Sequence, residues 1–288
     1  MQFLDVKTDY AFKKVFGSDT SKEILKSFLN ALVYDNKTIK IKDLKIGVKD
    51  TFVDVKAILD DDTKVIIEMQ VLNHTGFEKR VLYNAAKNYS LQLNKAEDYH
   101  LLNPVIALSI VDFNMFEDST SVTTNFKLIE KEQLLHYNDD IELIFVELPK
   151  FTKELEELEN IKDQWIYFIK NADSLEYIPE NLNNDIKQAL TYVNEANLTK
   201  DELESQHKRK EFISIQKLAI MKAKNDGIEQ GIVEGLEQGI EQGIEQGIGQ
   251  GIEQEKINIA KNLLDILDNR TIALKTNLTI ETIESLRC

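Results

Sequence analysis

Glu68 and Gln70 stand two residues apart in the segment IIEMQV, which is otherwise apolar and rich in strand-forming residues. Because strand side chains alternate between the two faces of a sheet, Glu68 and Gln70 project to one face and Met69 to the other. A solvated outer face is the simplest explanation for such a polar pair. The residues that precede the segment favour a chemical role instead.

A second carboxylate, Asp54, is expected directly opposite Glu68. The runs TFVDVKAIL (51–59) and KVIIEMQV (64–71) predict two strands, and the three aspartates between them predict a hairpin turn. A three-residue loop makes position 54 the partner of position 68. Like charges that face each other across a hairpin destabilise it, so we expect a cation between the two carboxylates. Mg²⁺, or another divalent cation, suits this pair because it prefers oxygen ligands and keeps several waters.

A divalent cation held by Asp54 and Glu68 indicates metal-assisted hydrolysis of a phosphodiester. The metal would lower the pKa of a water nucleophile and neutralise the charge that develops on the phosphate. Gln70 would orient that water or contact the phosphate, but an amide is no base near neutral pH. Lys56 lies on the predicted face of Asp54 and is a candidate for a catalytic role. The alternative is a surface lysine whose ammonium group is solvated.

Two helices are expected before these strands. Thr8 predicts the N-cap of a helix that runs through Phe16, and the segment TSKE (20–23) predicts a capping box for a helix to about Val33. Asp9 would either enter the site from the first helix or simply stabilise the helix dipole. The sequence does not separate these two roles.

Further strands and one helix complete a mixed α/β domain over the first 150 residues. The run IKIKDLKIGVKD (39–50) is β-rich, residues 76–95 have helical apolar spacing, and residues 103–113 and 141–148 predict strands. Glu147 ends the last of these strands. We expect it to be an edge residue rather than a third metal ligand.

The helix at 76–95 carries the residues expected to meet DNA. Lys79 and Arg80 are candidates for phosphate contacts, the alternative being a solvated helix face. Gln92, further along, is expected to point toward the site from this helix.

Composition limits the class of protein. A hydrophobic content of 42% supports a packed core, and no apolar run is long enough to cross a membrane or serve as a secretion signal, so a cytoplasmic protein is expected. The one cysteine, Cys288, excludes an internal disulfide, and the four histidines lack metal-ligand spacing. The net charge of -15 argues against a protein that coats DNA. Residues 1–56, however, hold 11 Lys against 8 acidic residues, so a nucleic acid would meet this part of the chain.

Residues 227–254 form a tetrapeptide repeat, GIEQ and close variants, which holds eight of the chain's eleven glycines. Each glycine costs a helix about 0.8–1 kcal/mol relative to alanine, so a lone helix here would be marginal. A helical spacer or an oligomerisation element is favoured over a flexible linker. The tail, 255–288, predicts two or three short helices with a turn near residues 268–270. Its balanced charges support a packing or dimer module at least as well as a DNA-binding one.

Six blocks of the sequence together resemble those of one nuclease family. They are DYAFKKVFG (9–17), DVKA (54–57), IEMQ (67–70), FEKRVLYNAAKNYSLQL (77–93), YHLLNPVIALSIVDFNMF (99–116) and IELIFVELPKF (141–151). They resemble the Rpn family of recombination-promoting nucleases and transposases, in the PD-(D/E)XK nuclease superfamily. The resemblance implies magnesium-dependent DNA cleavage, with Asp54 and Glu68 as metal ligands. The superfamily's catalytic lysine is replaced here by Gln70.

The expected fold is α/β, a restriction-endonuclease-like mixed sheet flanked by helices and followed by an α-helical C-terminal extension. We expect a PD-(D/E)XK nuclease-like domain at 1–151, a helical extension at 152–226, the GIEQ repeat segment at 227–254 and a small helical tail at 255–288. Assembly into a homo-oligomer is expected through the C-terminal region.

The expected function is that of a Mg²⁺-dependent DNA endonuclease of the transposase or recombination-promoting type. Its setting would be recombination, mobile-element biology or phage defence. The rival hypotheses are a catalytically inactive scaffold that binds DNA or protein, and a ribonuclease on the same fold.

Overall fold

A computed structural model of the chain describes residues 1–34, 41–47 and 54–287. The chain divides into two compact units, Met1–Lys217 and Leu218–Cys288. Helix α6, Lys200–Leu263, contributes its first turns to the first unit and the remainder to the second.

The first unit is built on a six-stranded mixed sheet with the strand order β1-β2-β3-β4-β6-β5. Its strands are β1 Leu44–Ile46, β2 Val55–Leu59, β3 Lys64–Gln70, β4 Val105–Val111, β5 Thr123–Ile129 and β6 His136–Glu147. Strands β3, β4 and β6 run parallel to one another, whereas β1, β2 and β5 are each paired antiparallel. The centre of the sheet is therefore parallel and its two sides are antiparallel.

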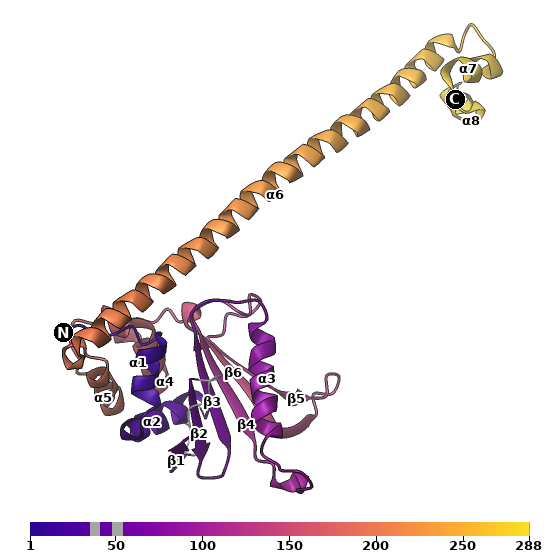
Figure 1. Ribbon diagram of the computed structural model, residues 1–288. Coiled ribbons are helices and arrows are strands. Elements are labelled where there is room, and N and C mark those ends of the chain that lie inside the picture. Colours follow the sequence, from indigo (N-terminus) through magenta and orange to yellow (C-terminus); the bar gives the residue numbers. More distant parts are fainter. Residues whose placement is uncertain (35–40, 48–53, 288) are drawn as a thin grey trace. The chain divides into compact units, whose positions relative to one another are not determined.

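Helices cover both faces of this sheet (Figure 1). Helices α1 Asp9–Phe16, α2 Lys22–Leu32, α4 Ile161–Asn171 and α5 Asn184–Tyr192 lie on one face, and α3 Phe77–Ser90 lies on the other. Strand β4 is buried along its whole length because apolar side chains leave it on both sides. This arrangement confirms the predicted α/β fold of a mixed sheet flanked by helices.

The hairpin of β2 and β3 has the predicted register. Val55 pairs with Ile67 and Ala57 pairs with Val65, as a three-residue loop requires. Val55 and Ile67 both point into the core on the side of α1 and α2, whereas Ile66 packs toward α3. Glu68, one pair further along, therefore belongs to the face that meets α3.

Local capping signals account for one of the first two helices and miss the start of the other. Helix α1 begins after Thr8, whose hydroxyl accepts a hydrogen bond from the backbone of Ala11, as predicted. The predicted capping box at 20–23 is wrong: a short 3-10 turn precedes α2, and Ser18 caps that turn by accepting from the backbone of Thr20. The hydroxyl of Ser18 thus accepts from the backbone N–H of Thr20, which Glu23 would have accepted from in a capping box.

Two other boundaries differ from the sequence pattern. Strand β5 was not expected, because its exposed, mixed side chains show no two-residue alternation, and β6 begins five residues before the predicted start at 141. Helix α3 ends at Ser90, not at residue 95. Of the β-rich run predicted at 39–50, residues 44–46 form β1, while 39–40 and 48–50 lie outside the described residues.

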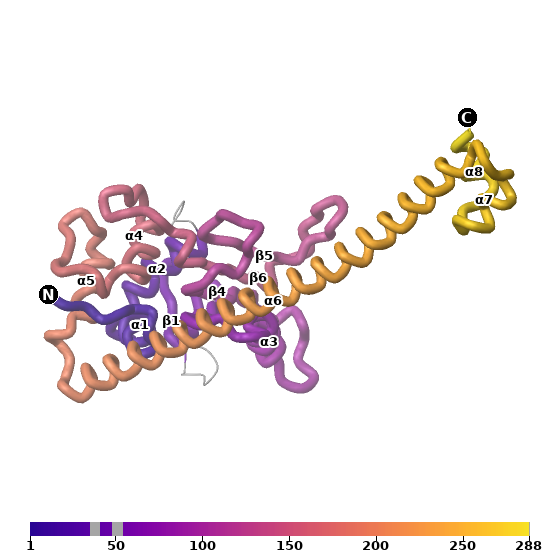
Figure 2. Tube along the Cα trace, turned by 90° about the horizontal axis from the view of Figure 1, so that it is seen from above, coloured from indigo at the N-terminus to yellow at the C-terminus, as the bar shows by residue number. Residues whose placement is uncertain are grey.

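The aromatic centre of the first unit joins helices from distant parts of the chain. Trp165 of α4 is fully buried, with ring centroids 5.9 Å from Phe16 of α1 and 5.6 Å from Phe28 of α2. At the N-terminus, Phe3 forms a β-bridge with Asn194, so this end of the chain lies beside α5 (Figure 2). Helices after residue 151 therefore complete the core against which α1 and the sheet pack.

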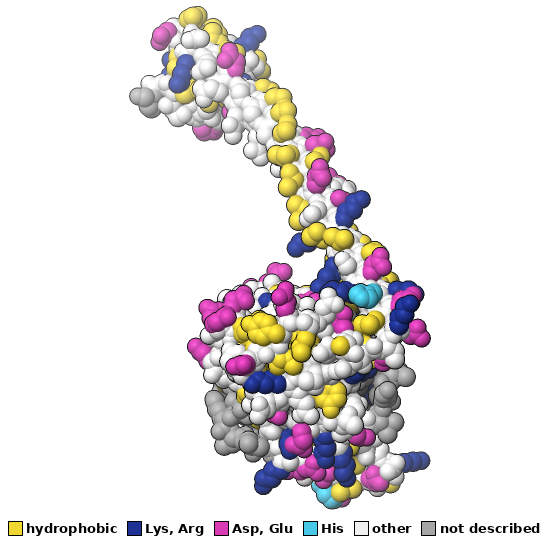
Figure 3. Space-filling model, turned by 90° about the vertical axis from the view of Figure 1, so that its left-hand side faces the viewer, with side chains coloured by type: hydrophobic (Ala, Val, Ile, Leu, Met, Phe, Trp, Pro, Cys, Tyr) yellow, Lys and Arg dark blue, Asp and Glu magenta, His cyan; other side chains and the backbone are white. Residues whose placement is uncertain are grey.

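The second unit consists of the later part of α6 with α7 Asn269–Thr276 and α8 Ile280–Arg287. Asp268 caps α7 at the predicted turn, and a small core of Ala260, Ile272, Leu278 and Ile283 holds the end of the chain together. The GIEQ repeat segment is helical, as predicted, and its hydrophobic side chains form an exposed stripe (Figure 3). Within the described residues, no helix combines the length and apolar character needed to cross a membrane.

Candidate active site

Asp54 lies at the start of β2 and turns toward α1. Its Oδ2 accepts a hydrogen bond from the backbone nitrogen of Met69 at 2.8 Å, and its Oδ1 lies 3.3 Å from Nζ of Lys13. Lys13 also pairs with Oδ1 of Asp9 at 2.6 Å. Asp9 and Lys13 lie one turn apart on the same face of α1. The helix thus places both side chains next to the carboxylate of Asp54.

The two aspartates have pKa values shifted in opposite directions. Burial, followed by a hydrogen bond with Asp9, raises the pKa of Asp54 to about 6, although the backbone of Met69 and the charge of Lys13 oppose the shift. Burial also tends to raise the pKa of Asp9, but the hydrogen bond with Asp54 and the cation of Lys13 outweigh it and lower that pKa. Asp54 is therefore the member of the pair that holds a proton longer as the pH rises.

An open cavity of about 650 Å³ lies in front of Asp54. Its polar lining comes from α1, the start of β2 and the first turn of α6: Asp9, Tyr10, Lys13, Lys14, Ser18, Asp19, Asp54, Lys56 and Glu202. The hydroxyl of Tyr10 donates to Glu202 at 2.5 Å and so fixes the start of α6 at one side of the cavity. Acids and lysines alternate around this space, which therefore offers both cation ligands and phosphate contacts.

Glu68 and Gln70 share a partner on α3. The guanidinium of Arg80 donates to Oε1 of Glu68 in a short ion pair, and the same nitrogen donates to Oε1 of Gln70 at 2.7 Å. The amide nitrogen of Gln70 donates to the carbonyl of Leu72 at 2.6 Å, which fixes the orientation of the amide. Burial raises the pKa of Glu68, while Arg80 acts against that shift.

The two predicted metal ligands therefore have different neighbours. Asp54 pairs with Lys13 of α1, and Glu68 pairs with Arg80 of α3. Asp54 accepts a hydrogen bond from the backbone of Met69, the residue that follows Glu68. Each carboxylate is thus paired with a cation of the protein.

The donor set is compatible with Mg²⁺. Over the described residues, no group of three or more His, Cys, Asp or Glu side chains could hold a metal ion. Mg²⁺ is commonly bound by only one or two carboxylates, with waters and substrate phosphate in the other positions. Asp54 and Glu68, both of which accept hydrogen bonds and ion pairs through oxygen, are the residues that would hold it.

The other predicted site residues lie in different surroundings. Lys56 donates to Oδ1 of Asn88 on α3 at 2.8 Å and also lines the cavity in front of Asp54. Lys79 is exposed on α3. Gln92 lies beyond the end of α3, and both ends of its amide bind the backbone of Asn103, so its predicted role in DNA binding stays a prediction.

Glu147 is fully buried at the end of β6, an interior strand, and is not the edge residue that was expected. Its carboxylate accepts from the backbone of Met115 at 2.6 Å and of Phe116 at 3.1 Å, and it pairs with Lys150 at 2.6 Å. This arrangement fixes the chain that follows β4. Every oxygen of Glu147 that the structure describes thus has a structural partner.

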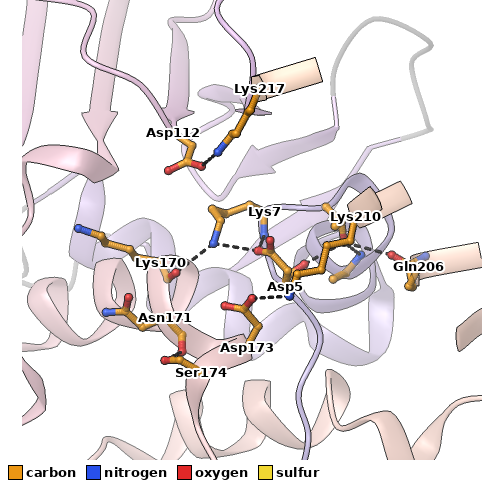
Figure 4. Close-up of polar contacts among 12 residues, drawn as sticks. Asp5, Lys7, Asp112, Lys170, Asn171, Asp173, Ser174, Gln206, Lys210 and Lys217 are labelled. Carbon is orange, nitrogen blue, oxygen red and sulfur yellow. Dashed lines mark hydrogen bonds and ion pairs between the residues drawn. The ribbon is translucent and has the colours of Figure 1, made fainter. Parts of the chain in front are cut away.

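Two residues near the site, Lys13 and Asp112, carry signals that the sequence offered only weakly. Lys13 stands four residues after Asp9, the spacing that places two side chains on one helix face. Asp112 directly follows the buried strand β4, and its backbone binds the carbonyl of Gln70 at 2.9 Å. Its carboxylate pairs with Lys217 of α6 at 2.6 Å, and Lys210 pairs likewise with Asp173 (Figure 4). Lys217 therefore anchors α6 at the carboxyl edge of the parallel strands, and Lys210 anchors it beside the end of α4.

Comparison with known protein families agrees with this fold. The model of the PD-(D/E)XK nuclease family transposases matches residues 6–223, about three quarters of the chain. The chain belongs to this family of nucleases and transposases, which confirms the resemblance found in the sequence. No curated protein and no solved structure matches it. Nucleases of this superfamily generally use divalent metal ions.

Proposed function

We propose that the protein is a divalent-metal-dependent DNA endonuclease, with Mg²⁺ as its metal, of the transposase or recombination-promoting type. Asp54 and Glu68 hold the metal in this proposal, and the phosphodiester binds at that metal, between the cavity in front of Asp54 and Arg80 on α3. The observation that supports the proposal is that Asp54 lines a cavity shared with Lys13, Lys14 and Lys56, while Glu68 of the adjacent strand pairs with Arg80. In this proposal the two carboxylates share one metal ion and the cations bind the phosphate.

The chain's own groups would prepare the site in a definite way. The backbone of Met69 fixes one oxygen of Asp54 and leaves the other facing the cavity, where Lys13 now lies. Gln70 is held by Leu72 and presents its amide oxygen beside Glu68. A bound divalent ion would supply a water of lowered pKa and neutralise charge on the phosphate. In the reaction, the water oxygen bonds to phosphorus as the ester bond breaks, the water loses a proton to solvent, and the leaving oxygen gains one.

Lys79 and Arg80 are proposed to meet the DNA, and Lys56 is proposed to act in catalysis. Lys56 enters the cavity from β2, and Lys79 and Arg80 lie next to each other on the exposed side of the first turn of α3. Lysine and arginine contacts of this kind position the phosphate backbone and make affinity depend on salt. Gln92 completes the proposed DNA-binding set, although in the structure its amide binds Asn103.

The test is cleavage of supercoiled plasmid by the purified full-length chain, with Mg²⁺ or with a chelator. We expect Mg²⁺-dependent nicking, and at least a hundredfold loss in Asp54→Ala. The matched control is Asp118→Ala, which removes an exposed aspartate from the loop after β4. Equal nicking by wild type and Asp54→Ala would overturn the assignment of this site.

An RNA substrate of the same length as a linear DNA substrate separates the ribonuclease alternative from the proposed one. Cleavage of RNA alone would move the function to RNA on the same fold. DNA binding without any cleavage would support a catalytically inactive scaffold. A cytoplasmic setting, homo-oligomerisation through the C-terminal region, and a part in recombination or phage defence belong to the same proposal.

A further inference from the structure

Arg80 is the one cation that contacts both polar residues of the E-x-Q pair in the described part of the chain. One guanidinium nitrogen donates to Glu68 and to Gln70, the latter at 2.7 Å. These two residues leave β3 on the face that α3 covers. The contact is therefore a product of how the helix packs on the sheet, not of local sequence spacing.

The position of Arg80 is fixed from two sides. Its guanidinium lies 5.3 Å from the ring centre of Phe77, which is buried at the start of α3. Gln70, whose own amide is bound to Leu72, holds the other side. The arginine side chain is still 43% exposed, and a guanidinium has five N–H donors, of which the contacts to Glu68 and Gln70 use those of one nitrogen. A guanidinium held in this way can bind a phosphate oxygen without giving up its anchor.

At position 70, where related nucleases carry a lysine, β3 has the uncharged side chain of Gln70. An amide can accept and donate hydrogen bonds, but it cannot neutralise the charge that develops on a phosphate. Lys56 is the nearest alternative on the hairpin, and its ammonium group donates to Asn88 instead. Among the described residues, Arg80 is the one cationic side chain that donates a hydrogen bond to Gln70.

We propose that Arg80 is a catalytic residue that supplies, from α3, the positive charge missing from β3. This inference rests on the proposed function and goes beyond a general DNA contact. Gln70 positions the guanidinium, and a free N–H pair of Arg80 binds the scissile phosphate and stabilises the charge formed as water adds. Arg80 neither takes nor gives a proton, since its guanidinium stays charged at all relevant pH values.

The experiment measures the single-turnover rate at saturating DNA, and separately the DNA dissociation constant in Ca²⁺. Arg80→Ala should lower the rate about 100- to 1000-fold, in line with the loss of one preorganised charge contact. Its DNA dissociation constant should rise less than tenfold. Lys131→Ala, which removes an exposed lysine from the β5–β6 connection, is the control and should leave both values unchanged.

A compensating variant distinguishes catalysis from structural support. In Gln70→Lys combined with Arg80→Ala, the strand regains a cation, and the rate should recover at least tenfold over Arg80→Ala alone. Arg80→Gln, which keeps the length and one anchor of the side chain, tests the loss of charge if the alanine variant fails to fold. Fluorescence of the single tryptophan, Trp165, reports folding of each variant.

Three outcomes would overturn the inference. If Arg80→Gln cleaves as fast as wild type, the charge of Arg80 is not needed. A loss without recovery in the double variant, or a loss seen only in DNA affinity, reduces Arg80 to a structural or binding contact. An absence of Mg²⁺-dependent cleavage by wild type is a fourth result, distinct from these three, and it overturns the proposed function itself.

Discussion

The ammonium group of Lys13 lies 3.3 Å from Oδ1 of Asp54 and 2.6 Å from Oδ1 of Asp9. One lysine of α1 thus serves two carboxylates, of which Asp54 has the raised pKa. The charge that the protein uses to balance Asp54 lies on the open side of the cavity. A divalent ion that enters the cavity would compete with this lysine for Asp54.

The raised pKa of Asp54 predicts how stability changes with pH in the absence of metal. The pKa is about 6 in the folded protein, against 3.8 for an ordinary aspartate, so the folded state binds the proton more tightly. The stability gained from neutral Asp54 is fully present below about pH 4 and is lost as the pH rises through about 6. Relative to Asp54→Asn, wild type should lose about 1–3 kcal/mol in free energy of unfolding between pH 4 and pH 7.5.

Urea unfolding of both proteins at a series of pH values measures this difference. The asparagine variant has no titrating group at the position, so the acids that do not contact Asp54 cancel in the comparison, and the difference reports Asp54 together with its partner Asp9. Asp118→Asn, at an exposed aspartate, should follow wild type at every pH. A difference between wild type and Asp54→Asn that stays constant over this range would contradict the burial of the Asp54 carboxylate.

Glu147 and Lys150 form a buried ion pair that holds the segment after β4. Glu147→Ala should destabilise the protein by about 3–5 kcal/mol, because it leaves the ammonium group of Lys150 and two backbone N–H groups without their acceptor. Combining it with Lys150→Met should recover part of the loss, since no unpaired charge remains. Denaturant unfolding of the two single variants and the double variant gives the coupling directly.

This prediction also separates structure from catalysis. Glu147→Gln keeps the shape of the side chain and one acceptor oxygen for the backbone of Met115 and Phe116. Per folded molecule, it should cleave DNA as fast as wild type. A folded Glu147→Gln protein without activity would show that this carboxylate takes part in the chemistry.

Local sequence signals account for the hairpin but not for the surroundings of its acids. Alternation along β3 places Glu68 and Gln70 on one face, and the loop length sets the register of Val55 with Ile67. The turn of Asp54 toward α1 depends on a helix that lies some 40 residues earlier in the chain. No pattern within the hairpin contains that information.

The contacts of Arg80 on α3 and the position of β5 also depend on long-range packing, so the sequence did not predict them. Arg80 meets Glu68 and Gln70 only because α3 packs against the sheet through Phe77, Val81 and Ala85. Strand β5 escaped prediction because its side chains are mostly exposed and its register is irregular. Its position is set by pairing with β6, which a single segment of sequence does not reveal.

The aromatic cluster around Trp165 makes the helices after residue 151 necessary for the stability of α1 and α2. Phe28→Ala should lower the free energy of unfolding by about 3–5 kcal/mol, because Phe28 is fully buried and packs edge-on against Trp165. Tyr177→Ala, at a side chain that is 63% exposed, should change it by less than about 0.5 kcal/mol. Urea unfolding followed by Trp165 fluorescence measures both. Equal stability of the Phe28→Ala variant and wild type would mean that α2 does not pack on α4.

The glycines of the repeat should be replaceable at a gain in helix stability. A Cβ atom added at Gly235, Gly239 or Gly243 would meet no atom within 4 Å, so each alanine should stabilise the helix by about 0.8–1 kcal/mol. Far-UV circular dichroism during heating of the full chain measures this gain. Gly17→Ala is the contrasting control, because its Cβ would lie 2.8 Å from the carbonyl oxygen of Lys13 and should destabilise α1.

The same alanine variants test whether the repeat joins chains together. If helices approach each other through the glycine column, three added methyl groups force them apart, and the oligomer measured by sedimentation should dissociate at a higher protein concentration than that of wild type. The isoleucine column, of which Ile240 is 61% exposed, would then lose its cover as well. An unchanged oligomeric state with increased helicity would mean that the glycines make no contact between chains. The GIEQ repeat would then serve as a helical spacer. Its glycines would only lower the stability of that helix.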